Sequence, residues 1–351
     1  MLKSLQVGRA FAALAVLSYH VAVAFRLPKY FGVEPFGPIF LPGYSGAYFF
    51  FVLSGYIIFQ AHWQDLGVPA RIIAYLWSRA TRIYPMYWIA TLATLVGTLF
   101  VPSAREAFNA QPAYLFGAVT LLPFVEDKAV LPVAWTLFHE MLFYLIFSSL
   151  LVSKRLGVLL IGFWGFGCCI SAVYQNIDGP LGVIFSPINL LFFVGGASFL
   201  VLKRKKISKP LIIFALGAAL FIAAWSYIAF YPSEAYAGLP NATLGIASGM
   251  IVAGAVGYET TMGMSAPRFV LFLGAASYSI YLTHFFLISI FCKIFTQFAS
   301  QLPASISFSL ITLFSIGIGC TIYSLVERPI HQFFKARVHR ARELELLPVR
   351  K

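Results

Sequence analysis

The sequence predicts an all-α protein that crosses a membrane about ten times, with both termini in the cytoplasm. Three observations support this prediction. Hydrophobic residues make up 60% of the 351 residues and charged residues only 11%, whereas soluble domains carry roughly a quarter charged residues. Apolar runs of about 20 residues, enough to span a bilayer, recur along the whole chain. Basic residues gather in alternate segments between these runs, as in multi-pass membrane proteins.

Ten apolar segments are expected to form the spanning helices. They are residues 8–26, 43–61, 83–101, 134–152, 156–174, 183–201, 210–230, 239–257, 269–291 and 304–325. A shorter run at 113–124 is too short to cross and predicts an interfacial or re-entrant segment. Residues 1–330 are thus expected to form one transmembrane domain. Residues 331–351 are expected to form a short basic cytoplasmic tail along the inner leaflet, attracted to anionic lipid.

The basic residues set the expected orientation. With the N-terminus inside, the inner segments hold 20 of the 25 Lys and Arg residues, as the positive-inside rule requires. With an odd number of spans, the basic residues would no longer gather on one side of the membrane. Because the basic residues form no single patch, the net charge of +13 indicates membrane lipids as partners and no nucleic acid.

Ionisable side chains inside the spans are functional candidates, because burying such a group in lipid costs several kcal/mol. Glu140 is the one acid expected well inside a span, and three of the six histidines, His20, His139 and His284, are also inside. At 1.5 Å of rise per residue, His20 and Glu140 lie about 9 Å below the outer surface and His284 about 10 Å. These three groups are therefore expected at one level in the outer half of the membrane.

His20 and Glu140 together fit general-base chemistry. An imidazole accepts a proton near neutral pH, and a nearby carboxylate orients the ring and stabilises the imidazolium. This arrangement activates a hydroxyl nucleophile. For His284, a functional role and a structural role between helices both stay open. For His139 the structural role is favoured, because its side chain points about 100° away from that of Glu140. No second His follows at zinc-motif spacing, so no metal is expected.

Three arginines form a second candidate group at the inner face. Arg9 starts the first expected span, and Arg79 and Arg82 precede the third, on one helix face. Guanidinium groups suit phosphate oxygens, although these residues also fit simple positive-inside anchors. Arg9 and His20 are about 16 Å apart along one helix. A coenzyme A thioester would place its phosphates on the arginines and its reactive end near His20, while a lipid-linked sugar phosphate would enter from the outer side.

Six short motifs in order along the chain resemble those of the acyltransferase-3 family of bacterial integral membrane acyltransferases. They are the Arg, ten residues, His spacing of Arg9 and His20; the aromatic run 48–56; Arg-x-x-Arg-x-x-Pro at 79–85; Trp-Thr-Leu…Glu…Phe-Tyr at 135–144; the segment 277–284; and Val-Glu-Arg-Pro at 326–329. The resemblance covers nearly the whole chain. His139 departs from it, since small polar residues are more usual at that position.

The resemblance implies an O-acyltransferase of the bacterial inner membrane. It would move an acyl group, usually acetyl or succinyl, from acyl-CoA to a hydroxyl of a surface glycan or its lipid-linked precursor. His20 would be the catalytic base, assisted by Glu140, and Arg9, Arg79 and Arg82 would hold the donor. Acetyl-CoA would then be a substrate, with no permanently bound cofactor. The further candidates for substrate or oxyanion contacts are Ser54, Trp135, Tyr281 and His284.

Many relatives append a secreted hydrolase-like domain. This chain ends soon after the tenth span, so it is expected to resemble the stand-alone members that decorate exopolysaccharide or nodulation factors.

Two other function classes also fit a buried His and a buried Glu. A proton-coupled transporter or glycolipid flippase would use them as a proton relay, and it predicts internal repeats and broken helices. A structural subunit of a polysaccharide export machine predicts that both residues tolerate substitution.

Overall fold

The computed structural model describes residues 2–99, 112–122, 130–174, 179–205, 207–235 and 238–345. Within these residues the protein is helical and contains no strand. The long helices are α1 (Lys3–Arg26), α2 (Ser45–His62), α3 (Ile72–Leu99), α6 (Trp135–Val152), α7 (Lys154–Val173), α9 (Leu190–Arg204), α10 (Pro210–Phe230), α11 (Gly238–Met262), α12 (Arg268–Phe298), α13 (Ala304–Ile322) and α14 (Arg328–Glu345). Two short helices, α5 (Pro112–Thr120) and α8 (Gly179–Ile184), complete the set.

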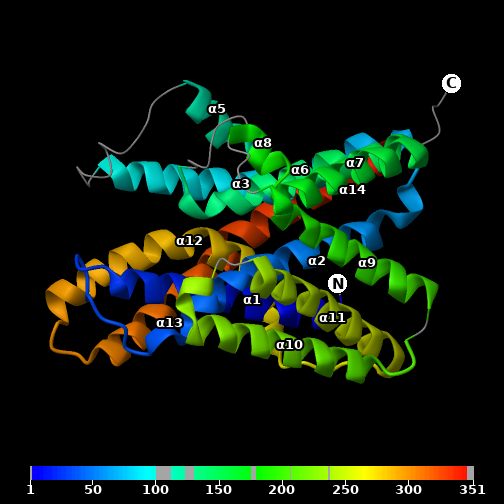
Figure 1. Ribbon diagram of the computed structural model, residues 1–351. Coiled ribbons are helices and arrows are strands. Elements are labelled where there is room, and N and C mark those ends of the chain that lie inside the picture. The colour runs from blue at the N-terminus through cyan, green and yellow to red at the C-terminus, as the bar shows by residue number, and fades with distance from the viewer. Residues whose placement is uncertain are drawn as a thin grey trace.

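Nine helical segments of the described residues are long and apolar enough to cross a membrane. Each of them overlaps one of the ten expected spans. The remaining expected span, 83–101, falls on α3, which is 28 residues long and begins eleven residues earlier than expected. Successive long helices run back and forth along one direction, and the two chain ends lie toward the same side of the bundle (Figure 1). The prediction of an all-α polytopic membrane protein is confirmed.

Helix α1 lies at the centre of the bundle, where it packs mainly against α12, with α2 beside it (Figure 1). Leu17, Val21 and Phe25 on α1 are completely buried. Two glycines make the close approach possible. A Cβ added at Gly274 of α12 would lie 2.1 Å from the carbonyl oxygen of Gln6, and one at Gly46 of α2 would lie 2.3 Å from that of Ala12. Only glycine fits such backbone-to-backbone contacts.

The short apolar run expected to be interfacial forms α5, which is nine residues long. Its C-terminal carbonyls are capped by aromatic side chains of α3. The hydroxyls of Tyr84 and Tyr87 donate to the carbonyls of Thr120 and Ala118, and the indole of Trp88 donates to that of Val119 at 3.0 Å. Because the last carbonyls of a helix have no partner within it, these contacts fix α5 against α3.

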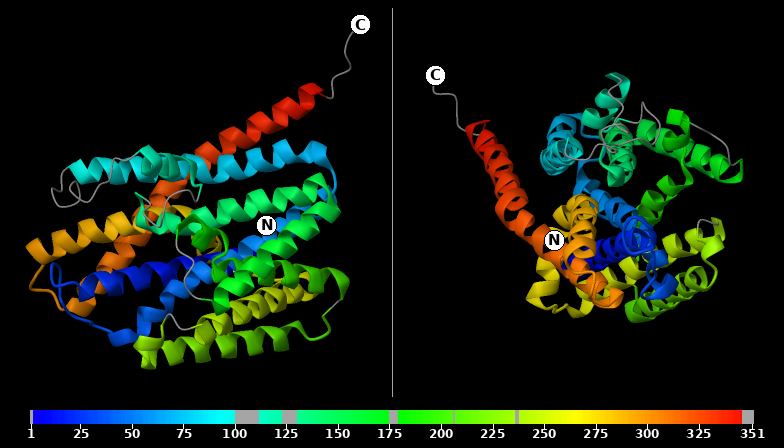
Figure 2. Two further views of the ribbon diagram at one scale, coloured as in Figure 1. Left: turned by 45° about the horizontal axis from the view of Figure 1, so that its top comes forward. Right: turned by 90° about the vertical axis from the view of Figure 1, so that its left-hand side faces the viewer.

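The chain continues from α13 into α14 through a π-helical turn, Tyr323–Glu327. The two helices form one long rod that leaves the bundle at its C-terminal end (Figure 2). The expected boundary between transmembrane domain and tail, after residue 330, therefore lies within the first turn of α14. Single-turn π insertions in helices occur frequently at functional sites, and this one directly precedes α14, which lines the cavity described next.

Candidate active site

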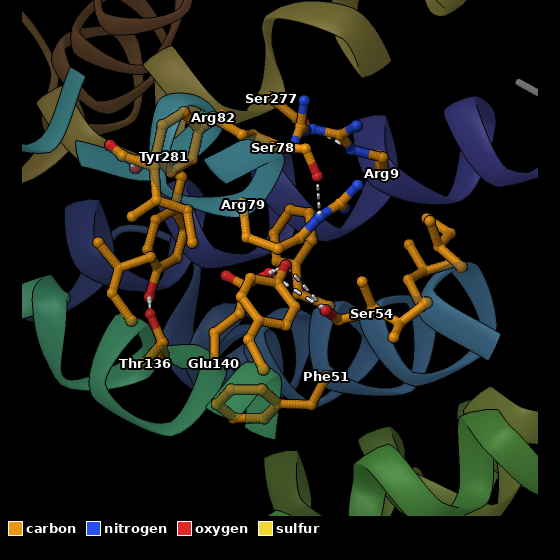
Figure 3. Close-up of a pocket in the computed structure, with 18 of the residues that line it drawn as sticks. Arg9, Phe51, Ser54, Ser78, Arg79, Arg82, Thr136, Glu140, Ser277 and Tyr281 are labelled. Carbon is orange, nitrogen blue, oxygen red and sulfur yellow. Dashed lines mark hydrogen bonds between the residues drawn. The ribbon is translucent and has the colours of Figure 1, made fainter. Parts of the chain in front are cut away.

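A cavity of about 680 Å³ opens between α1, α2, α3, α6, α12 and α14. Six of the residues singled out in the sequence line it: Arg9, Ser54, Arg79, Arg82, Glu140 and Tyr281. Most of the remaining wall is apolar, with Phe50, Leu53 and Ile57 of α2 among its members. Three helices remote in sequence, α1, α3 and α6, thus bring the predicted basic and acidic groups to one space, as Figure 3 shows.

The three arginines converge on one side of this cavity (Figure 3). The Arg9 Nε donates to the Ser277 hydroxyl at 3.2 Å, and the Arg79 Nε donates to the Ser78 hydroxyl at 3.2 Å. Among the described residues, no carboxylate lies within 4.0 Å of any of the three guanidinium groups. Their positive charge is therefore not neutralised by direct ion pairs. Clustered, uncompensated guanidinium groups form a binding site for phosphate or carboxylate.

The deep position of these arginines differs from the sequence-based expectation. Arg79 and Arg82 were expected before the third span, and Arg9 at the very start of the first. Instead, α3 begins at Ile72 and α1 at Lys3. All three arginines therefore lie one to three turns after the start of their helices. The Arg79 guanidinium lies 5.9 Å from the centre of the Tyr144 ring. An aromatic face of this kind stabilises a cation in partly apolar surroundings.

Glu140 is the one acid that lines the cavity. The Ser54 hydroxyl donates to its Oε1 at 3.1 Å, and the Tyr144 hydroxyl donates to the same oxygen. Tyr144 follows Glu140 by four residues on α6, which places both side chains on one helix face. In this structure Glu140 is hydrogen-bonded to Ser54 and Tyr144 and not to His20; α1 packs mainly against α12 and α2, whereas α6 packs against α7 and α3. Equal depth in the membrane did not place the two side chains together.

His20 pairs instead with His284. The His20 Nδ1 lies 3.1 Å from the His284 Nε2, and the ring centres are 4.8 Å apart. The Nδ1 of His284 is 2.6 Å from the Tyr281 carbonyl oxygen, and the Nδ1 of His20 is 2.9 Å from the Val16 carbonyl oxygen. A nitrogen facing a carbonyl oxygen must carry the proton, so both rings are protonated at Nδ1.

This assignment from the hydrogen-bond network also determines whether each remaining ring nitrogen carries a proton. When both rings are neutral, the His20 Nδ1–H donates to two acceptors, the Val16 carbonyl oxygen and the His284 Nε2. The Nε2 of His20 is then unprotonated, and no described residue hydrogen-bonds to it. A neutral imidazole with a free Nε2 lone pair is the form that acts as a general base.

The cavity and the His20–His284 pair are adjacent but separate. His20 and His284 do not line the cavity, whose wall on that side contains Phe50 and Tyr281. The Tyr281 ring centre is 5.7 Å from that of His284 and 5.8 Å from that of Phe50. The Tyr281 hydroxyl donates to the Val133 carbonyl at 3.2 Å and lies 3.0 Å from the Thr136 hydroxyl. The Tyr281 ring therefore lines the cavity and also contacts His284, whereas neither histidine is part of the cavity lining.

Trp135 and His139 lie outside the cavity lining. The Trp135 ring packs against Phe51 and His139. The His139 Nδ1–H donates to the Asn189 side-chain oxygen at 2.9 Å, and Asn189 in turn donates to the carbonyls of Val183 and Ile184. This buried chain of hydrogen bonds joins α6 to the start of α9, which agrees with the structural role favoured for His139.

Sequence reasoning missed other residues around the cavity: Tyr144, Ser277, Tyr278, His331 and Lys335. The spacing of four between Glu140 and Tyr144 is a signal that identifies Tyr144. The hydroxyl of Tyr278 donates to the Ile83 carbonyl at 2.8 Å and holds α12 against α3 beside Arg82. Glu327, in the Val-Glu-Arg-Pro segment, accepts from the backbone N–H and the hydroxyl of Ser279.

The sequence was compared with families and proteins that are already known. The acyltransferase domain model of the acyltransferase-3 family matches residues 2–324. The chain belongs to this family. It is also 30% identical, over 310 residues, to the exopolysaccharide production protein ExoZ of Rhizobium meliloti (strain 1021), a match that covers 87% of this chain and 94% of that protein. No solved structure matches the chain with significance.

The family and the nine apolar spans together make the protein a multi-pass membrane acyltransferase. The arrangement of its site suits that chemistry. A cation-lined cavity fits the charged end of an activated donor, and a neutral histidine with a free Nε2 fits the removal of a proton from an acceptor.

Proposed function

We propose that the protein is a membrane O-acyltransferase of the bacterial inner membrane, with both termini in the cytoplasm. It transfers an acyl group, acetyl in the simplest case, from acyl-CoA to a hydroxyl of an exopolysaccharide glycan or its lipid-linked precursor. The likeness to an exopolysaccharide production protein supports the choice of acceptor. The observation that carries the donor assignment is the group of three guanidiniums without a carboxylate partner in the described part of the chain.

The donor occupies the cavity with its phosphates on Arg9, Arg79 and Arg82. Its neutral arm extends along the apolar wall toward Tyr281. Glu140 accepts hydrogen bonds from the amide N–H groups of that arm, which gives this carboxylate a role in donor binding. The Ser54 hydroxyl donates to Glu140 and the Tyr281 hydroxyl donates to the Val133 carbonyl, so either hydroxyl must leave its present acceptor before it can contact the developing oxyanion.

His20 acts on the acceptor. The Nε2 lone pair takes the hydroxyl proton as the oxygen attacks the acyl carbon, the carbon–sulfur bond then breaks, and the imidazolium returns the proton to the leaving thiolate. His284 keeps His20 in the tautomer that has this lone pair. In this proposal the thioester reaches Tyr281 from the cavity, and His20 lies outside the cavity beside His284, so the wall of the cavity at Tyr281 must open before transfer. Closure of this wall between turnovers protects the thioester from water.

The test is transfer of radiolabelled acetyl groups from acetyl-CoA to glycan in membranes that contain the protein or a variant. The unaltered protein is expected to label the polysaccharide, and His20→Ala is expected to lose labelling while remaining folded and membrane-inserted. Retained labelling by His20→Ala defeats the role of His20. Glycan acylation that does not depend on acyl-CoA defeats the proposed donor, and it favours the transporter or export-subunit alternatives.

A further inference from the structure

Helix α14 contributes to the cavity, although its sequence suggests only a basic surface tail. His331, Phe334 and Lys335 line the cavity together with Arg79 and Arg82 of α3. Their spacing of three and four residues places them on one face of α14. His331 and Lys335 are exposed to solvent, so they stand where the cavity opens to water, whereas Glu140 and Tyr281 line it on the side of α6 and α12.

This face of α14 is held against α3. The Phe334 ring packs edge to face on Trp77, with the ring centres 6.2 Å apart. The contact fixes α14 along α3, and the α14 cations line the cavity together with Arg79 and Arg82. Arg82, Lys335 and Arg79 all act electrostatically on His331. The π-helical turn before α14 is fixed by the two hydrogen bonds between Ser279 and Glu327.

The charges that line the cavity are strongly unbalanced. Arg9, Arg79, Arg82 and Lys335 are cations, His331 lies among them, and Glu140 is the one acid of the lining. The other nearby carboxylate, Glu327, acts electrostatically on Arg82 and Arg9 but does not line the cavity. Like charges gathered in this way repel one another, and a ligand with several negative charges removes the repulsion. A single phosphate bound by the three arginines leaves the cations of α14 without a negative partner.

We propose that His331 and Lys335 of α14 form a second phosphate subsite at the mouth of the cavity, so that the donor is a thioester of a nucleotide with phosphates at more than one position. The inference rests on the proposed function and deepens it. The arginines bind the phosphates nearer the thioester arm, and α14 binds the phosphate at the far end of the nucleotide. A pantetheine thioester without the nucleotide lacks the group that α14 recognises, and so does phosphopantetheine attached to a carrier protein.

The experiment compares Lys335→Ala, Lys335→Arg and His331→Ala with the unaltered protein in neutral-lipid nanodiscs. Donors are acetyl-CoA, acetyl-3′-dephospho-CoA and acetyl-pantetheine. For Lys335→Ala we expect the KM for acetyl-CoA to rise about tenfold with kcat unchanged. A tenfold change corresponds to the loss of one charge-assisted hydrogen bond. The KM for the other two donors should not change, and Lys335→Arg should recover most of the loss. Lys205→Ala, which removes an exposed lysine at the end of α9 away from the cavity, is the matched control.

A phosphate on a lipid headgroup is the competing source of the same chemistry. If the effect of Lys335→Ala appears only in nanodiscs with anionic lipid and is equal for all donors, α14 binds lipid and the proposal is wrong. Equal KM values for Lys335→Ala and the unaltered protein with acetyl-CoA also overturn it.

Direct binding of coenzyme A, measured without catalysis, separates this inference from the proposed function. Coenzyme A binding that weakens in Lys335→Ala supports the subsite even if no acyl transfer is found. Binding of equal strength in both proteins rejects the subsite even if transfer to glycan is demonstrated.

Discussion

The Nδ1 of His20 on α1 lies 3.1 Å from the Nε2 of His284 on α12, and each histidine also faces a carbonyl oxygen of its own helix. The proton positions in this pair follow from those carbonyls. Each Nδ1 carries a proton, so His284 accepts and His20 donates. This relationship gives His284 a positioning role, since it holds the His20 ring without touching the acceptor itself.

Replacing His284 therefore tests the pair. We expect His284→Leu to lower kcat by roughly tenfold to a hundredfold, with the KM for acetyl-CoA unchanged. The loss is smaller than the full contribution of a general base, typically a hundredfold or more, because His20 itself remains. His284→Gln offers a side-chain oxygen to the His20 Nδ1–H and should recover part of the rate. The kinetic constants with acetyl-CoA and a glycan acceptor are the measurement. Equal loss in both variants, or a rise in KM, contradicts a positioning role.

The separation of the cavity from His20 predicts that donor binding and proton transfer can be lost independently. Arg79→Ala should weaken coenzyme A binding about tenfold to a hundredfold, as expected for a hydrogen bond to a charged group. His20→Ala should bind coenzyme A as the unaltered protein does, because His20 does not line the cavity. Calorimetric titration of coenzyme A into purified protein measures both. A large loss of affinity in His20→Ala contradicts the assignment of separate sites.

The Phe50 and Tyr281 rings line the cavity, and the Tyr281 ring also contacts His284, the partner of His20. Tyr281→Ala removes one ring and should join the cavity to the histidine pair. We expect acetyl-CoA to be hydrolysed at least several-fold faster in the absence of glycan, because water then reaches a thioester beside a general base. Release of free thiol reports the reaction. The double variant with His20→Ala should return hydrolysis to background, and persistent hydrolysis there means that His20 is not the base.

The approach of α12 to α1 depends on Gly274. A Cβ at this position meets the Gln6 carbonyl at 2.1 Å, so Gly274→Ala must push the helices apart. We expect a loss of about 1–3 kcal/mol in stability, the usual range for overpacking, together with reduced activity because His20 and His284 separate. Gly317→Ala on α13, where no atom lies within 4 Å of the added Cβ, is the control. Thermal unfolding in detergent compares the two, and equal melting temperatures would show that the bundle adapts.

The sequence predicted the helical membrane fold because each span carries its own apolar signal. It also predicted the meeting of Arg9, Arg79 and Arg82, since the positive-inside rule places them at one face of the membrane. The start of α3 was missed. The helix follows directly on Arg71, and its first turns contain Ser78 and Arg79. Polar residues of this kind indicate a loop when no cavity is known for them to line.

The partner of His20 could not be predicted in the same way. Depth along a helix follows from the residue count, but the rotation of the helix and its choice of neighbour depend on packing in the plane of the membrane. His20, Glu140 and His284 were placed at one depth, yet α1 packs mainly against α12, so His284 rather than Glu140 meets His20. Lys335 lay within a segment read as a surface tail, where nothing indicated a return to the cavity.

The π-helical turn Tyr323–Glu327 sets the angular register of everything that follows it. A residue in a helix accounts for about 100° of rotation, so losing a single amino acid from this turn would spin α14 by more than a quarter of a circle and face His331 and Lys335 away from the cavity mouth. Substitutions in the segment should be tolerated far better than changes in its length, and natural length variation here would alter which donors an enzyme accepts while its histidine pair stayed intact.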